Sequence, residues 1–348
     1  MNPYVAIILI SSLGLGTTLT FASSHWLLAW MGLEINTMAI LPLMARQHHP
    51  RAVEATTKYF LTQATAAALI LFASLMNAWT TGEWNIQQLS DPLATTLITL
   101  GLALKIGLAP VHFWLPEVLQ GLDLTTGLIL STWQKLAPFA LIYQIAPATQ
   151  PTLLFTLGVL SAMIGGWGGL NQTQLRKILA YSSIAHLGWM IIVLQMMPNL
   201  TLLALTTYIL MTAAMFMTLK ATTSTKINTL ALAWPKTPVL TTLTMLTLLS
   251  LGGLPPLTGF MPKWLIIQEL AKQDLAIAAT TMAMTALLSL FFYLRLCYAM
   301  TMTISPNTNN TATSWRLNSL QTNLPLAIAT AGATMLLPMT PTILNLIH

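Results

Sequence analysis

The sequence predicts an all-α membrane protein of about 11 transmembrane helices, arranged as two inverted repeats with two interrupted helices. Three observations lead to this fold class. The chain is 55% hydrophobic and 6% charged, with a mean hydropathy of +0.71, whereas soluble domains carry roughly 25% charged residues. Apolar runs of spanning length follow one another with short polar connections. Two of these runs contain the same pattern of helix breakers, a feature typical of transporters.

Each predicted span holds about 20 apolar residues, the length that crosses the hydrocarbon core of a bilayer. In chain order the spans are 3–22, 25–44, 55–79, 93–121 (interrupted), 124–146, 150–170, 177–197, 199–220, 237–271 (interrupted), 275–301 and 324–347. The longest connection, 302–323, is rich in asparagine and threonine, which favours a polar surface loop. The sequence therefore predicts one transmembrane domain over residues 1–348.

The two interruptions resemble each other in sequence. Gly107-Leu108-Ala109-Pro110 is followed by Pro116, and Gly253-Leu254-Pro255-Pro256 is followed by Pro262. They lie in the fourth and the ninth span, five positions apart, and because five is odd the two interruptions are expected to face opposite ways. Residues 1–146 and 150–301 then form inverted repeats, and 324–347 is an extra C-terminal helix. Chance duplication of common membrane residues is the alternative.

The distribution of basic residues indicates the orientation. With the N-terminus inside, the inner segments carry Arg46, Arg51, Lys58, Arg176, Lys177, Lys220, Lys226, Lys236 and Arg316. The outer loops carry only Lys272, beside Glu83, Asp91 and Asp274. This strong bias follows the positive-inside rule. It also accounts for the net charge of +6, so nucleic-acid binding is not expected.

Composition excludes several kinds of site. The single cysteine, Cys297, cannot form a disulfide within the chain or a four-cysteine metal or iron–sulfur site. The Gly14-Leu15-Gly16 segment lacks the strand–turn–helix context of a dinucleotide fingerprint. Gly165, Gly166, Gly168 and Gly169 provide small-residue spacing that favours close helix packing. An apolar run begins at Pro3 without a basic leader, so it is expected to be the first membrane helix.

Four ionisable residues stand out at bilayer depth in the predicted spans: Glu34, Lys105, Lys135 and Lys263. A charge at this depth costs at least about 2.5–3.5 kcal/mol, so such residues tend to be buried, paired and functional. Lys105 precedes the first interruption and Lys263 follows the second. The alternative is that they form structural ion pairs between helices. Glu117, near the end of the first interrupted helix, is expected either to support the break or to serve proton uptake.

A row of such groups bridged by water and histidine can carry protons. His112 follows Lys105 by seven residues, and His186 lies in the middle of the span 177–197. The order Glu34, Lys105, Lys135, His186, Lys263 suits a lateral chain of protonatable groups. Interhelical hydrogen bonding is the alternative for the two histidines.

Four segments together resemble the chain 2 family of NADH–ubiquinone oxidoreductase, respiratory complex I, in its vertebrate form. They are 32–36 (Gly-Leu-Glu-Ile-Asn), 48–52 (His-His-Pro-Arg-Ala), 54–60 (Glu-Ala-Thr-Thr-Lys-Tyr-Phe) and 254–260 (Leu-Pro-Pro-Leu-Thr-Gly-Phe). The resemblance implies an antiporter-like, proton-pumping subunit of the membrane arm. Its essential glutamate falls on Glu34, and its three lysines on Lys105, Lys135 and Lys263. His112 and His186 match histidines of the polar axis.

The resemblance also implies a setting. The chain would carry no cofactor, because FMN, the iron–sulfur clusters, NADH and ubiquinone would be bound by other subunits. Its partners would be other membrane-arm subunits, including neighbouring antiporter-like subunits, and lipids such as cardiolipin. It would lie in the mitochondrial inner membrane, with the N-terminus in the matrix and the C-terminus in the intermembrane space. A stand-alone monovalent cation/proton antiporter and a purely structural arm subunit are the alternatives.

Overall fold

The computed structural model describes residues 3–45, 49–234, 237–302 and 324–347, with side chains as far as 343. These residues form helices joined by short connections, and no β-strand occurs among them. They divide into two compact units, Met1–Ser161 and Ala162–His348, with the boundary inside one helix. Arg46, Lys236 and Arg316, which contribute to the predicted charge bias, lie outside the described residues.

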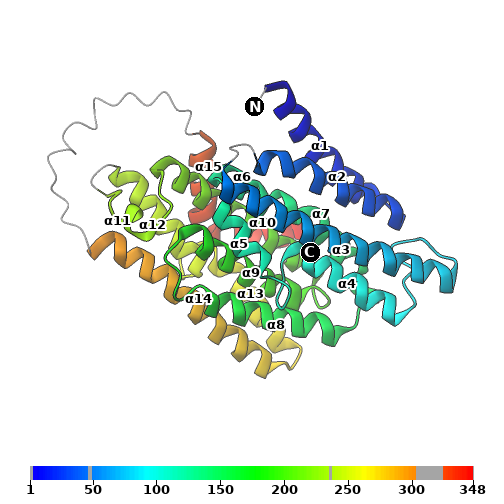
Figure 1. The fold of residues 1–348 in the computed structure, drawn as a ribbon. Coiled ribbons are helices and arrows are strands. Elements are labelled where there is room, and N and C mark those ends of the chain that lie inside the picture. Colours follow the sequence, from blue (N-terminus) through cyan, green and yellow to red (C-terminus); the bar gives the residue numbers. More distant parts are fainter. Residues whose placement is uncertain (1–2, 46–48, 235–236, 303–323, 348) are drawn as a thin grey trace. The chain divides into compact units, whose positions relative to one another are not determined.

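The first unit begins with long helices and continues with shorter ones (Figure 1). In order they are α1 (Pro3–Ala22), α2 (Trp26–Met44), α3 (Pro50–Thr81), α4 (Pro92–Ile106), α5 (Trp114–Gly121), α6 (Leu124–Ser131), α7 (Trp133–Ile145), a 3-10 turn (Ala146–Ala148) and the start of α8 (Pro151–Gly168). Helix α1 packs along α2, and α3 packs against both α4 and α5. A Cβ atom at Gly16 would lie 2.9 Å from the carbonyl oxygen of Gly32, and the reverse also holds. This glycine pair lets α1 and α2 approach closely.

The second unit contains most of α8 and the remaining helices: α9 (Leu175–Val193), α10 (Pro198–Thr222), α11 (Ile227–Ala231), α12 (Pro238–Gly252), α13 (Phe260–Lys272), α14 (Ala276–Met302), α15 (Leu324–Met335), a 3-10 turn (Leu337–Met339) and α16 (Thr340–Ile347). Gly165 and Gly169 confirm the predicted close packing. A Cβ at Gly165 would come within 2.9 Å of the Cα of Ala185, and one at Gly169 within 2.7 Å of the Phe292 ring.

The predicted spans correspond to helices, but some spans predicted as one helix are divided or bent in the structure. Six described helices, α1, α2, α3, α8, α10 and α14, are long and apolar enough to cross a membrane. The predicted helix 324–347 is instead bent by 66° between α15 and the segment that follows. The predicted helix 124–146 is divided at Thr132, and α11 was not predicted. The all-helical membrane fold is confirmed, whereas the number of eleven crossings stays a prediction.

A substitution at Gly107 tests the geometry of the first break. Gly107 has φ 88°, and an added Cβ would lie 2.8 Å from Cδ1 of the buried Leu115. A left-handed conformation costs a non-glycine residue about 1–2 kcal/mol. We expect Gly107→Ala to lower the unfolding temperature more than Gly82→Ala does. Gly82 has φ 78° but open space around its Cβ position, so it reports the backbone cost alone. Equal shifts in thermal unfolding of the assembled protein would contradict this expectation.

Candidate functional site

The two interrupted helices end in the same backbone structure. Helix α4 ends at Gly107 (φ 88°, ψ 43°) and α12 at Gly253 (φ 79°, ψ 40°), both left-handed. The next amide in each case reaches back to a carbonyl five residues earlier: Leu108 N to Ala103 O at 2.9 Å, and Leu254 N to Leu249 O at 3.3 Å. This is the Schellman type of helix end. The two predicted interruptions are therefore confirmed, each inside one unit.

The first unit brings Glu34 and Lys105 together. Glu34 Oε1 on α2 lies 3.9 Å from Lys105 Nζ on α4, and the two side chains are 22% and 2% exposed. The other carboxylate oxygen accepts a hydrogen bond of 3.0 Å from Thr37 Oγ1. Lys105 Nζ has no hydrogen-bond partner among the described residues. The separation exceeds hydrogen-bond length, so the pair attracts without being locked in a direct hydrogen bond.

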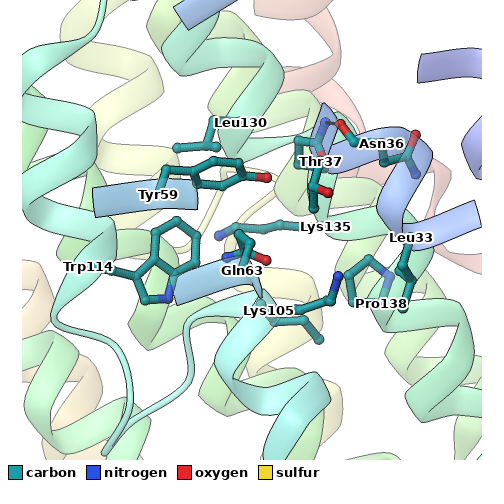
Figure 2. Close-up of a pocket in the computed structure, with 12 residues that line it drawn as sticks. Leu33, Asn36, Thr37, Tyr59, Gln63, Lys105, Trp114, Leu130, Lys135 and Pro138 are labelled. Atoms are coloured by element: carbon teal, nitrogen blue, oxygen red, sulfur yellow. Dashed lines mark hydrogen bonds between the residues drawn. The ribbon is translucent and has the colours of Figure 1, made fainter. Parts of the chain in front are cut away.

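Lys105 and Lys135 face one internal cavity (Figure 2). Lys135 lies in the first turn of α7 and is 3% exposed. The cavity offers about 10 Å³ to water centres, close to the volume that one water molecule needs. Its lining residues are Leu33, Asn36, Thr37, Tyr59, Gln63, Lys105, Ile106, Trp114, Leu130, Gln134, Lys135 and Pro138. Two lysines from different helices thus share a polar, water-sized space.

The division of the predicted helix 124–146 places Lys135 beside a break. Thr132 has φ −112° and ψ −69°, so the backbone leaves regular helix geometry before α7 begins at Trp133. Pro138 inside α7 cannot donate a backbone hydrogen bond, which leaves the carbonyl of Gln134 without its usual helical partner. The span 124–146, predicted as one uninterrupted helix, is therefore corrected: it is divided at Thr132, and Lys135 lies next to irregular backbone.

His112 lies on the first break itself. Its ring is 3% exposed, and Nδ1 is 3.2 Å from the carbonyl oxygen of Pro110. The ring also contacts Phe113, with centroids 4.4 Å apart. His112 is not among the residues that line the cavity of Lys105 and Lys135. The structure therefore places it in the interrupted segment, apart from that cavity.

Lys263 in the second unit turns back onto the helix before its break. Lys263 is 8% exposed, and Nζ donates hydrogen bonds to the carbonyl oxygens of Gly252 at 2.9 Å and Leu251 at 3.5 Å. Its stem lies against Gly253, where a Cβ atom would meet Cδ of the lysine at 2.8 Å. A cation is stabilised at the negative C-terminal end of a helix. Lys263 therefore caps α12.

His186 lies on α9, where the predicted span placed it. Its ring is partly buried and contacts the ring of Tyr208 on α10, with centroids 5.7 Å apart. Tyr208 is 1% exposed. His186 and Lys263 belong to the second unit, whereas Glu34, Lys105, His112 and Lys135 belong to the first. The structure thus groups the site residues within each unit, and a continuous chain through all of them stays a prediction.

Two hydroxyl groups that the sequence analysis did not single out meet the bent C-terminal helix. Ser250 Oγ donates a 2.6 Å hydrogen bond to the carbonyl oxygen of Ala333, and Thr258 Oγ1 donates to the same oxygen. The two hydroxyls also contact each other at 3.1 Å. Ser250 lies in the last turn of α12 and Thr258 lies in the break, so the second break is bonded to α15 just before its bend.

Removal of the Thr258 hydroxyl tests this link. We expect Thr258→Val, which keeps the shape, to destabilise the second unit by about 1 kcal/mol, because the Ala333 carbonyl loses a buried donor. Thr242→Val is the matched control, since the Thr242 hydroxyl bonds the Val239 carbonyl of its own helix. Thermal unfolding measures both. A shift for Thr258→Val no larger than that for the control would show that the link contributes nothing.

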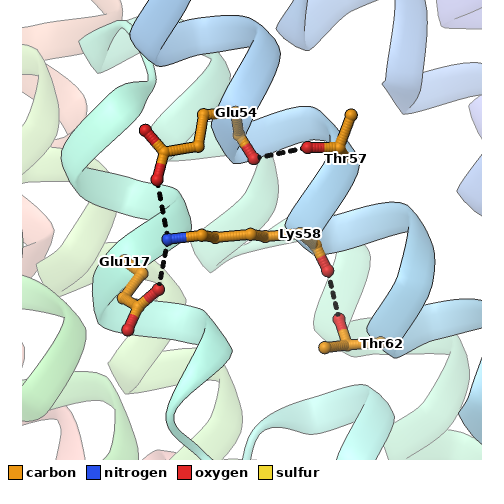
Figure 3. A network of polar contacts seen from close by, with 5 residues as sticks. All are labelled: Glu54, Thr57, Lys58, Thr62 and Glu117. Atoms are coloured by element: carbon orange, nitrogen blue, oxygen red, sulfur yellow. Dashed lines mark hydrogen bonds and ion pairs between the residues drawn. The ribbon is translucent and has the colours of Figure 1, made fainter.

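Glu117 belongs to an exposed ionic network (Figure 3). Lys58 Nζ lies 2.7 Å from Glu117 Oε2 and 2.8 Å from Glu54 Oε1. The three side chains are 42%, 54% and 62% exposed, respectively. The network joins α3 to α5, the helix after the first break. Of the two expectations for Glu117, this contact favours support of the break, and the Glu54–Lys58 pair gains a second carboxylate.

A family model described as the transmembrane region of NADH:quinone oxidoreductase and Mrp antiporters matches residues 23–289. A second, the C-terminus of NADH dehydrogenase subunit 2, matches residues 290–344. Chain 2 of NADH-ubiquinone oxidoreductase from Carassius auratus is 74% identical over 346 residues, 99% of each chain. The counterpart from Oncorhynchus mykiss is 71% identical over 343 residues, 99% of this chain and 98% of the relative.

The chain belongs to the NADH–ubiquinone oxidoreductase chain 2 family.

Solved structures agree with this membership. A chain of respiratory complex I from Thermus thermophilus superposes with a TM-score of 0.80 at 29% identity, covering 95% of this chain and 79% of that one. A chain of the Mrp complex from Dietzia gives a TM-score of 0.81 at 16% identity, covering 97% and 76%. The second likeness shows the fold alone. The antiporter-like fold expected from the sequence is thus confirmed for this member of the chain 2 family.

The chain 2 family is one of multi-pass membrane proteins, and the apolar helices of this chain agree with that. Among the described residues, no group of three or more histidine, cysteine, aspartate or glutamate side chains is placed to hold a metal ion.

The site residues that could not be singled out from the sequence are polar groups on buried helix faces. Tyr59 and Gln63, four residues apart on α3, both line the cavity, and that spacing in an otherwise apolar stripe was the available signal.

Proposed function

We propose that protons move through this chain along Glu34, Lys105 and Lys135 in the first unit and His186 and Lys263 in the second, with His112 at the first break. The chain acts as a proton-pumping membrane-arm subunit of NADH:ubiquinone oxidoreductase, complex I. One observation carries the proposed route: two buried lysines from α4 and α7 line one water-sized cavity, and one of them faces the partly buried carboxylate of Glu34. If these charged residues served only to form structural ion pairs between helices, they would not need a shared polar cavity.

The Glu34–Lys105 pair acts as the switch in this proposal. Attraction to Glu34 holds a proton on Lys105, because opposite charges within 4–6 Å favour each other's charged forms. At 3.9 Å the pair can tighten or open with a small shift between α2 and α4. When it opens, Lys105 releases its proton across the cavity to a neutral Lys135. When it closes, Lys105 is recharged from the Glu34 side.

Redox chemistry belongs elsewhere in the complex. NADH oxidation and ubiquinone reduction take place in other subunits, which bind FMN and the iron–sulfur clusters. This chain couples to them through conformation or charge along the membrane arm, in contact with neighbouring antiporter-like subunits and with lipids such as cardiolipin. It lies in the mitochondrial inner membrane with the N-terminus in the matrix and the C-terminus in the intermembrane space.

The stand-alone antiporter is not favoured. The likeness to the Mrp complex is one of fold at 16% identity, whereas the chain 2 relatives reach 74% over 99% of the chain. Purification separates the two functions. A subunit is recovered active only within a large NADH-oxidising assembly, whereas an antiporter exchanges cations when purified alone. If the subunit were purely structural, substitution of its buried lysines would leave assembly and proton pumping intact.

A double substitution tests the switch. We expect Glu34→Gln and Lys105→Met each to slow coupled proton pumping by about fivefold to tenfold, within the range of coupling energies between linked sites. The double variant is expected to be no slower than the worse single one, because the two residues act as a pair. Pumping is measured in vesicles containing the assembled complex. Independent, multiplying losses would show that Glu34 and Lys105 do not work together.

A further inference from the structure

The cavity between the two lysines contains a polar side chain that the proposed route does not use. Gln63, on α3, is 3% exposed, and its Nε2 atom is buried without a hydrogen-bond partner among the described residues. The other glutamine of the cavity, Gln134, donates its amide to the carbonyl oxygen of Asn36 at 3.2 Å. A buried amide without a partner is costly, so Gln63 requires a partner that lies in the cavity.

The position of Gln63 on its helix supports this conclusion. On the buried face of α3, Gln63 lies between Ala55 and Tyr59 on one side and Ala66, Ala67 and Ile70 on the other. An apolar side chain at position 63 would complete that face without cost. Figure 2 shows Gln63 drawn between Lys105 and Lys135, and all three line the same cavity. The amide therefore lines the cavity that the two lysines also line.

Lys105 Nζ has no hydrogen-bond partner among the described residues, so its proton can reach the lone pair of a neutral Lys135 only through a molecule that lies between them. An ammonium group donates three hydrogen bonds and accepts none, whereas a carboxamide has an accepting oxygen and a donating NH₂ group. The carboxamide can accept from whichever lysine is charged and donate to a water oxygen at the same time. It is neutral and does not itself carry the proton.

We propose that Gln63 is a positioning residue that holds a proton-carrying water between Lys105 and Lys135. This inference rests on the proposed route. In the step, an N–H bond of the Lys105 ammonium breaks and its proton passes to the water oxygen. The water releases another proton to the lone pair of neutral Lys135, where a new N–H bond forms. Lys105 ends neutral, Lys135 ends as ammonium, and the water is regenerated.

The test compares two substitutions of Gln63 in the assembled complex. Gln63→Met keeps length and burial but removes the amide, whereas Gln63→Asn keeps the amide on a shorter stem. We expect the methionine variant to pump about fivefold more slowly, as for a lost hydrogen bond, and to show a larger solvent deuterium isotope effect on pumping. The asparagine variant should keep about half of the parent rate or more, because bound water can fill the added gap.

Thr62→Val and Lys135→Met serve as controls. Thr62 neighbours Gln63, but its hydroxyl bonds the carbonyls of Lys58 and Tyr59 on its own helix, so its variant should pump normally. Rates are normalised to assembled complex, and Gln63→Ala replaces the methionine variant if the latter does not assemble. A parental rate and isotope effect in the amide-free variant, or equal losses with methionine and asparagine, would overturn the positioning role. If Lys135→Met stops pumping in that case, only the inference on Gln63 fails; if Lys135→Met pumps normally, the proposed route fails as well.

Discussion

Lys135→Met is expected to reduce proton pumping coupled to NADH oxidation through this chain by about a hundredfold, the lower range for loss of a proton-transferring side chain. Lys135 is 3% exposed, shares a cavity with Lys105 and stands beside irregular backbone at Thr132. Methionine matches the lysine stem and adds no charge, so the fold of α7 should persist. The measurement is the number of protons moved per NADH oxidised in vesicles that contain the assembled complex.

Two further variants separate proton transfer from charge. Lys135→Arg keeps a positive charge but cannot release a proton, because guanidinium is not deprotonated in proteins. We expect it to lose pumping as the methionine variant does. Lys272→Met removes a lysine whose side chain is 60% exposed and should pump normally. Normal pumping by the arginine variant would show that Lys135 supplies charge only, and normal pumping by the methionine variant would show that it is not on the route.

The sequence could predict the breaks because their cause is local. Gly107 and Gly253 adopt left-handed backbone conformations that other residues avoid, and the prolines that follow prevent the helix from continuing. The same reasoning identified Glu34, Lys105, Lys135 and Lys263, because a charge inside an apolar span is exceptional whatever its surroundings. Both inferences need only the residue and its immediate neighbours along the chain.

Features that depend on distant parts of the chain could not be predicted in this way. The helix is divided at Thr132, where the sequence has neither glycine nor proline. Just before the bend that follows α15, the carbonyl oxygen of Ala333 accepts hydrogen bonds from the hydroxyl groups of Ser250 and Thr258. The partner of Glu117 is Lys58, far away in the sequence. Each of these features depends on how helices pack together, and the residue pattern of a single segment does not reveal that packing.

Helix packing also explains why the two breaks use their lysines differently. In the first unit, Trp114 Nε1 donates a 2.9 Å hydrogen bond to the Leu104 carbonyl in the last turn of α4. A neutral indole therefore holds that helix end, and Lys105 is left to face Glu34. In the second unit, Lys263 itself bonds the last carbonyls of α12. When Gly107 is aligned with Gly253, Lys105 falls on Leu251 and Glu117 falls on Lys263. The different contacts at the two breaks give this asymmetry a physical cause.

Substitution of Lys263 is expected to affect both pumping and stability. Lys263→Met removes the donor to the Leu251 and Gly252 carbonyls, which should destabilise the end of α12 by about 1–2 kcal/mol, as for a cation lost from a partly buried helix C-terminus. Pumping should fall by at least about tenfold, because the side chain also loses its exchangeable proton. Thermal unfolding and amide hydrogen exchange over residues 253–259 report the first effect, and pumping in vesicles reports the second.

Lys263→Arg separates these two effects, because arginine can still donate to helix carbonyls but does not release its proton. We expect the arginine variant to keep near-parental exchange protection in the break while pumping no better than the methionine variant. In the parent, loss of the proton turns a charged donor into a neutral one and weakens its hold on α12, since charge-assisted hydrogen bonds are roughly twice as strong. The proton on Lys263 would thereby set how firmly the second break is held, and through Ser250 and Thr258 how firmly α15 is held at Ala333. Unchanged hydrogen exchange in the methionine variant would disprove this coupling even if pumping were lost.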